Sequence, residues 1–305
     1  MFPKNPSYHK VKKKYLKFIK SQEILSEPFR DKIGQLNSFY FPISRTINKI
    51  YLKKKKTQVI GLTGGQGSGK STISNILKII LKENYNLETV IFSIDDFYKT
   101  LKEREIMSKK ISPLFLTRGV PGTHDTKMIF NCIKRLTNKK FQRFKIPKFD
   151  KAIDDRASKR KWLKVTKKPH IVIFEGWCVG VQHQKNKDLL IAINELEKHQ
   201  DKKRIWRRIV NQELKKNYKK IFKLIDKTIF LKVPSFKHVL NWRLLQEKKL
   251  RIKVKGKKTM SDDQIKKFIM FYERITKHML QTLTYKADSV IEIDTKHRLK
   301  SIKFN

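Results

Sequence analysis

The stretch TQVIGLTGGQGSGKST, at residues 57–72, decides the fold of this 305-residue chain. It opens with residues 57–63, an apolar run of the kind that forms a buried strand. Residues 64–71 then match the pattern G-x4-G-K-[ST], and helical spacing of apolar residues begins at about residue 72. This order of strand, glycine-rich turn and helix predicts a phosphate-binding loop, or P-loop, because backbone N–H groups can converge on a phosphate where side chains are absent.

The loop predicts a binding site for ATP and Mg²⁺. Lys70 should reach the β- and γ-phosphates, and Ser71 should place its hydroxyl on the metal. The start of the following helix adds the positive end of its dipole. The expected nucleotide-binding residues are Gly64, Gly65, Gln66, Gly67, Ser68, Gly69, Lys70, Ser71 and Thr72.

Short apolar runs alternate with helical stretches along the rest of the chain, while turn signals dominate residues 100–165. The alternation predicts an α/β protein with a three-layer P-loop NTPase fold, in which helices cover both faces of a central, mainly parallel sheet. We expect further strands at 89–95, 170–175, 228–233 and 289–294, and helices at 72–84, about 186–224, 235–250 and 262–283.

The first 56 residues set apolar positions among lysines. This pattern predicts a helical N-terminal extension, interrupted at Phe39–Ile43 and packed on the main domain. We therefore expect two parts, an extension of residues 1–56 and a P-loop domain of residues 57–305.

A net charge of +46 raises the question of a nucleic-acid partner. Lysine dominates, in scattered pairs and short runs such as Lys53–Lys56, and we find no arginine-rich face or nucleic-acid motif. The charge therefore favours steering of anionic substrates to the site over nucleic-acid binding.

Cysteine content and hydropathy bear on the compartment. Cys132 and Cys178 lie far apart and form no CxxC pair, which argues against a disulfide framework or a zinc site. The N-terminus lacks the apolar core of a signal peptide, and no stretch approaches the ~20 apolar residues that span a membrane. We expect a soluble, cytoplasmic protein without a membrane partner; its oligomeric state stays open.

Acidic residues follow two of the expected strands, at the edge where a parallel sheet binds its ligands. Asp95 and Asp96 close the strand at 89–95. A carboxylate there can accept the proton of an attacking hydroxyl, although Asp is also a natural helix N-cap. Glu175 follows an apolar run, where a P-loop enzyme carries its second metal carboxylate, so we expect Ser71 and Glu175 to form the metal site.

Other charged residues lie in segments without a motif of their own. Arg118, His124 and Asp125 share one turn, and Lys151 and Arg156 share another loop. Taken singly, such residues are typical of surface loops. They become candidate site residues only through the resemblance described next.

The blocks together resemble a known family. GGQGSGKST, FSIDDFY, RGVPGTHD, KIPKFDKA with DDRA, VIFEGWCVG, and WRLLQE followed by MSDDQIKKFIMFYE resemble the plant-type D-glycerate 3-kinases and their fungal and bacterial relatives. That family belongs with the uridine kinase, phosphoribulokinase and pantothenate kinase branch of P-loop kinases. The resemblance runs in order from about Phe39 to about Asp294, and so covers most of the chain.

The resemblance implies a role for each residue. Lys70, Asp95 and Arg243 would be catalytic, with Asp95 as the base and Arg243 on a mobile lid. The residues implied to bind the substrate are Asp96, Tyr98, Arg118, His124, Asp125, Lys151 and Arg156. Lys151 and Arg156 are the candidates for binding its carboxylate. Which of Asp95 and Asp96 abstracts the proton stays open.

The sequence therefore predicts an ATP-dependent small-molecule kinase that converts D-glycerate to 3-phosphoglycerate. One alternative keeps the kinase and changes the acceptor to a nucleoside or a pantothenate-like hydroxyl compound. Another is a nucleic-acid-associated ATPase, which the charge motivates. The basic loops favour a carboxylate over an uncharged nucleoside. Two departures from the family, Gly64-Gly65 at the start of the P-loop and a shorter loop after Lys151, affect the acceptor pocket.

Overall fold

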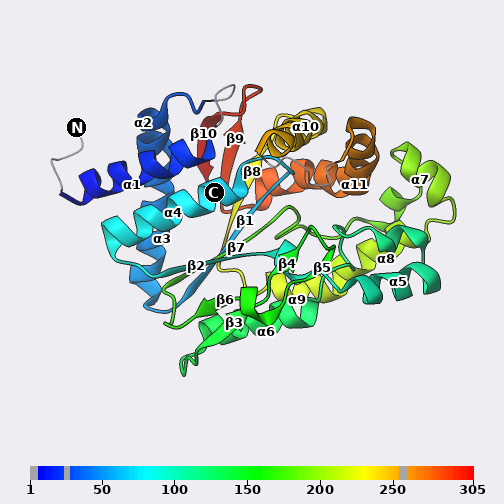
Figure 1. Cartoon of the computed structure of the whole chain (residues 1–305), viewed down its shortest axis with the longest axis horizontal. Helices are drawn as coiled ribbons and strands as arrows, with labels where there is room; N and C mark the ends of the chain where they lie inside the picture. Colours follow the sequence, from blue (N-terminus) through cyan, green and yellow to red (C-terminus); the bar gives the residue numbers. More distant parts are fainter. Residues whose placement is uncertain (1–5, 24–27, 254–259) are drawn as a thin grey trace.

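A six-stranded sheet forms the centre of the fold, in the order β10-β9-β8-β1-β7-β2 (Figure 1). All neighbours pair in parallel except β10 and β9, which are antiparallel. The computed structural model describes residues 6–23, 28–253 and 260–305. The strands are β1 (Gln58–Gly64), β2 (Thr89–Ser93), β7 (Ile171–Gly176), β8 (Lys227–Lys232), β9 (Ser289–Ile293) and β10 (Leu299–Phe304). The predicted α/β fold with a mainly parallel sheet is confirmed.

Helices cover both faces of this sheet, so the central strands β1 and β7 are buried along their whole length. Helix α4 (Lys70–Tyr85) packs against β1, β2 and β7, and α1 (Pro6–Gln22) and α3 (Phe41–Lys54) pack in turn on α4. Helix α11 (Asp262–Lys286) packs against β8. Figure 1 shows α1–α4 gathered on one side of the sheet and α11 on the other.

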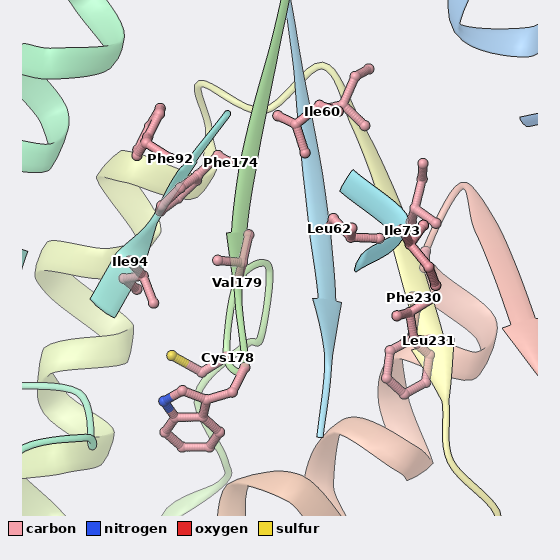
Figure 2. Close-up of a cluster of buried hydrophobic side chains, with 14 of the residues drawn as sticks. Ile60, Leu62, Ile73, Phe92, Ile94, Phe174, Cys178, Val179, Phe230 and Leu231 are labelled. Atoms are coloured by element: carbon pink, nitrogen blue, oxygen red, sulfur yellow. The ribbon is translucent and has the colours of Figure 1, made fainter. Parts of the chain in front are cut away.

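Buried side chains from the central strands and α4 join the layers (Figure 2). Ile60 and Leu62 of β1 and Ile73 of α4 all belong to this cluster. Phe92 of β2 stacks on Phe174 of β7, with ring centroids 4.9 Å apart. All five are at most 3 % exposed, so the apolar runs that predicted the strands supply the core of the fold.

Strand β2 is shorter than predicted, so two candidate residues, Asp95 and Asp96, lie beyond its end. Strand β2 ends at Ser93, and Ile94–Phe97 form a 3-10 turn. The Ser93 hydroxyl accepts from the Asp95 N–H, while the Asp96 carboxylate accepts from the Ser93 N–H. This reciprocal capping starts a new helical turn and ends the strand, so the prediction that the two aspartates close a strand is wrong.

The stretch expected to be helical at about 186–224 is helical over much of its length, but it is divided into several short helices. The segment holds α7 (Glu195–Gln200), α8 (Ile205–Glu213), a π-helical turn at Leu214–Tyr218 and α9 (Lys219–Phe222), preceded by a 3-10 turn at Asn186–Leu189. Helix α8 starts afresh because the Asp201 carboxylate accepts from the backbone N–H groups of Trp206 and Arg207. Such a carboxylate at a helix start satisfies donors that would otherwise lack partners.

Residues 100–165 contain more regular structure than their turn signals suggested. Helices α5 (Leu101–Lys110) and α6 (Thr126–Thr137) lie there, and β3 pairs with β6 and β4 with β5 in antiparallel hairpins. The hairpin strands are β3 (Phe144–Ile146), β6 (Leu163–Val165), β4 (Phe149–Asp150) and β5 (Asp155–Arg156), and 3-10 turns occupy Pro113–Leu116 and Lys159–Lys161. Two candidate substrate residues belong to the β4–β5 hairpin: Lys151 directly follows β4, and Arg156 lies in β5.

The N-terminal region is helical, as predicted, but without the expected interruption. Helix α2 (Lys32–Gln35) leads through a π-helical turn at Leu36–Tyr40 into α3. Pro42 lies in the first positions of α3, where a missing N–H is tolerated, so the segment stays helical. Side chains of α1 and α3 belong to the same apolar cluster as the sheet, and the boundary at residue 56 remains a prediction.

Two further observations concern the helices and the cysteines. None of the described helices combines the length and the apolar character needed to cross a membrane. Cys132 and Cys178 are buried free thiols.

Candidate active site

A tight glycine loop joins β1 to α4 and forms the predicted phosphate cradle. Gly67 has a φ of 76°, a left-handed conformation that suits glycine. A Cβ at Gly67 would lie 2.9 Å from Cβ of Trp242, and one at Gly65 would lie 2.7 Å from a methyl group of Val239. Helix α10 (Phe236–Lys253), which carries both contacts, thus packs directly on the loop. The loop places the N-terminus of α4 at Lys70, where anions are stabilised.

Lys70 and Ser71 occupy the first turn of α4. The Lys70 ammonium donates to the carbonyls of Gly64 and Gly65, at 2.9 Å each. The Ser71 hydroxyl donates to the Glu175 carboxylate of β7, at 2.8 Å. Burial lowers the pKa of Lys70 and raises that of Glu175, and each charge partly offsets the shift of the other.

These residues fit ATP and Mg²⁺. The Ser68 hydroxyl is buried in the loop without a partner among the described residues, so the cradle keeps a donor for a phosphate oxygen. The Ser71 hydroxyl and the Glu175 carboxylate, two oxygen donors already in contact, are the type of ligand that Mg²⁺ accepts. Mg²⁺ needs only one or two protein ligands when phosphates and water supply the rest.

The two aspartates of the 3-10 turn have different surroundings. Asp95 accepts one hydrogen bond from the Tyr98 hydroxyl at 2.8 Å and one from the Lys151 ammonium at 2.9 Å. Burial opposes ionisation of Asp95, but the adjacent Lys151 charge and these hydrogen bonds hold its pKa well below the usual range. Asp96 instead caps the turn through Ser93 and pairs with Lys148 at 2.9 Å.

One cleft brings the two halves of the predicted site together. It has a volume of about 450 Å³, with Ser71 and Glu175 at one part of its wall and Asp95 and Lys151 at another. Its lining residues are Ser71, Ser93, Asp95, Asp96, Lys148, Phe149, Asp150, Lys151, Ala157, Lys161 and Glu175.

Tyr98 and His124 lie behind the cleft, where Tyr98 contacts Asp95 and neither residue lines the cavity itself. They share an isolated β-bridge, and their rings stack with centroids 4.5 Å apart. His124 is 1 % exposed, and its Nδ1 lies 2.5 Å from the Tyr218 hydroxyl. The Asp125 carboxylate caps α6 through the Met128 N–H, so part of this predicted substrate residue serves the fold.

Two of the basic residues predicted near the substrate, Arg156 and Arg118, have different partners. Arg156 donates to the Tyr98 carbonyl at 3.4 Å and lies 3.6 Å from the Asp125 carboxylate. Arg118 forms an ion pair with Asp154 and lies over the Phe149 ring, 5.5 Å from its centroid. The structure thus places Arg156 next to Tyr98, whereas the charge of Arg118 is already matched.

The predicted lid arginine is held within its own helix. Arg243 forms an ion pair with Glu247 at 2.7 Å, and both side chains are largely buried, Glu247 at 3 % exposure. Its neighbour Trp242 packs on the P-loop and stacks on His297, with ring centroids 4.2 Å apart. Part of the expected lid, residues 254–259, lies outside the described residues.

Several residues of the site could not be found from motifs. Tyr218, which contacts His124, lies 94 positions further along the chain, in a stretch that was predicted only to be helical. Lys148, Asp154 and Glu247 each pair with a predicted site residue. Only Glu247 carries a local signal, because it follows Arg243 at the i,i+4 spacing of helical ion pairs.

Burial of His124 has a consequence for stability. Burial lowers its pKa to about 4, with Asp95 opposing the shift, whereas the unfolded value is about 6.5. The unfolded chain therefore binds the proton first, so the contribution is present above pH 6.5 and is lost as pH falls toward 4. We expect the wild type to lose about 2 kcal/mol more unfolding free energy than His124→Gln between pH 7 and pH 5. Denaturant titrations at the two pH values measure this, and equal losses in both proteins would contradict it.

Comparison with known proteins decides the family. Residues 59–213, about half of the chain, match the phosphoribulokinase/uridine kinase family. The chain belongs to this family. As a member it is a P-loop kinase, a phosphotransferase, and the family implies ATP as the phosphoryl donor. The resemblance to this family that the sequence blocks indicated is confirmed.

Individual members of the family extend the similarity beyond the P-loop. An uncharacterised kinase of Schizosaccharomyces pombe is 32% identical over 237 residues, which are 75% of this chain and 83% of the relative. The chloroplastic D-glycerate 3-kinase of Arabidopsis thaliana is 29% identical over 234 residues, 74% of this chain and 48% of the relative.

A solved structure shares the fold over most of the chain. The D-glycerate 3-kinase of Cryptococcus neoformans superposes with a TM-score of 0.74 at 22% identity, covering 88% of this chain and 99% of the other. At this identity the similarity is evidence for a shared fold alone.

Proposed function

We propose that this member of the family transfers the γ-phosphoryl group of ATP to the primary hydroxyl of D-glycerate, forming 3-phosphoglycerate. The similarity to D-glycerate 3-kinases in both sequence and fold supports the acceptor. The observation that carries the proposal is the single cleft in which the Ser71–Glu175 pair and the Asp95–Lys151 pair meet. Phosphoryl donor and hydroxyl acceptor need adjacent sites of this kind.

Each residue of the first half has a role in holding the donor. The loop N–H groups and the α4 terminus bind the phosphates, and the Lys70 ammonium exchanges its loop carbonyls for phosphate oxygens. Ser71 and Glu175 would hold Mg²⁺, which draws charge off the transferring phosphoryl group when bound. Arg243 would add a further positive charge once it turns from Glu247 toward the phosphates.

Asp95 is the base in this proposal. Its pKa lies below the usual range, so it is ionised at neutral pH and its free lone pairs can orient the acceptor hydroxyl and take its proton. Its hydrogen bonds to Tyr98 and Lys151 fix the orientation of the carboxylate. Asp96 is committed to capping the turn, which favours Asp95 over Asp96 as the base.

Positive charge and free donors favour a carboxylate-bearing acceptor. Lys148, Lys151 and Lys161 line the cleft. The Arg156 Nε and the His124 Nε2 are buried without a partner among the residues that the structure describes, and both residues contact Tyr98. Buried donors without partners are costly, so an anion that satisfies them gains affinity.

A coupled ADP-release assay with ATP and Mg²⁺ tests the proposal. The acceptors to compare are D-glycerate, L-glycerate, uridine, pantothenate and DNA. We expect turnover with D-glycerate well above all others, with phosphate on its 3-position, and no turnover by a Lys70→Ala preparation made in parallel. Turnover with another acceptor alone would refute the substrate and keep the kinase, whereas stimulation by DNA alone would favour the ATPase alternative.

A further inference from the structure

Tyr218 and His124 form a fully buried hydrogen-bonded pair next to the proposed acceptor site. Tyr218 is 0 % exposed and His124 1 %. The Tyr218 oxygen lies 2.5 Å from Nδ1 of His124, and it also accepts from the Gly122 N–H at 3.2 Å. The other ring nitrogen of His124, Nε2, is buried and has no partner in the described part of the chain.

This geometry favours one arrangement of the two hydrogens between Tyr218 and His124. The Tyr218 oxygen accepts from Gly122, and the only acceptor near its own hydrogen among the described residues is Nδ1 of His124. A neutral imidazole that accepts at one nitrogen carries its proton on the other. His124 therefore holds an N–H at Nε2, and burial, which lowers its pKa to about 4, keeps the ring neutral at pH 7.

We propose that Tyr218 is a positioning residue that locks His124 in the Nε2–H tautomer, and that this Nε2–H donates to the acceptor acid. The second part rests on the proposed function. His124 stacks on Tyr98, whose hydroxyl binds Asp95, so the donor lies in the same packed unit as the base. An unpaired buried N–H costs free energy, and the bound acceptor would recover it. A site built to donate one hydrogen bond rejects ligands that lack the matching acceptor atom.

The tautomer can be measured without turnover. In wild-type protein labelled with ¹⁵N-histidine, the ring nitrogen shifts should show His124 with an unprotonated Nδ1 and a protonated Nε2 at pH 7. The spectrum of His124→Gln assigns the signals. Addition of D-glycerate should shift the Nε2–H resonance. A protonated Nδ1 in the wild type would overturn the lock, even if the Tyr218 variant failed to fold.

Tyr218→Phe removes the hydroxyl and keeps the ring. We expect a measurable share of the Nδ1–H tautomer, a KM for D-glycerate raised about tenfold, and a KM for ATP changed by less than about twofold. Tyr15→Phe is the matched control, because Tyr15 is also buried and donates one hydrogen bond, to the Lys32 carbonyl, in the N-terminal helices. Its KM values and its His124 signals should equal those of the wild type.

The outcomes separate this inference from the function on which it rests. A retained tautomer in Tyr218→Phe, or equal rises of both KM values, would leave Tyr218 with a structural role only and overturn the proposal. A changed tautomer with an unchanged KM for the acceptor would overturn the role of Nε2–H. Failure of the wild type to phosphorylate D-glycerate would refute the proposed function, while the NMR spectra would still decide the lock.

Discussion

Lys70→Ala should lower kcat by about 10³-fold or more, the largest effect we expect from a single substitution. The Lys70 ammonium lies at the start of α4 and already binds the loop carbonyls beside the phosphate cradle. Removing it takes away the charge that would neutralise the transferring phosphoryl group. The coupled ADP-release assay with D-glycerate measures the loss.

The control for Lys70 is Lys78→Ala on the exposed face of the same helix. It removes the same charge and chain length, so it should keep wild-type kcat. Thermal melts of both proteins establish that α4 remains folded. Near-normal turnover by a folded Lys70→Ala protein would contradict the assignment of the P-loop to catalysis.

Asp95→Asn should lower kcat by about 10²- to 10⁴-fold, because the amide cannot take a proton. The substitution keeps the shape of the side chain and an oxygen for Tyr98, so binding of the acceptor should change less than turnover. Steady-state kinetics at saturating ATP separate kcat from the KM for D-glycerate. Equal kcat values in Asp95→Asn and the wild type would remove Asp95 from the role of base.

Asp96→Asn is the matched comparison, since it makes the same chemical change one residue away. Asp96 caps the 3-10 turn and pairs with Lys148, so its neutralisation should lower thermal stability by about 1 kcal/mol and cost kcat far less than Asp95→Asn. The reverse ranking of the two variants would transfer the role of base to Asp96.

Much of the fold was predictable because its signals are local. The P-loop pattern and the apolar runs of β1, β7, β8 and β9 depend on neighbouring residues only, and these strands lie where expected. Strand β10 escaped prediction because it lies at an exposed edge, so few of its residues are buried. The break before α8 could not be predicted from apolar spacing, because it depends on the hydrogen bonds of one side chain, Asp201.

The site likewise has a part that local sequence predicts and a part that depends on distant residues. The sequence by itself determined the phosphate-binding loop, because Gly64 to Ser71 are consecutive and their conformation follows from glycine and from a helix start. Only the tertiary structure decided the acceptor half. Asp95 meets Lys151 across 56 positions, and His124 meets Tyr218 across 94, because the sheet and the loops that follow it bring these segments together. Their pairing depends on burial and on which hydrogen bonds remain available there, and these properties belong to the folded chain and to no single segment of it.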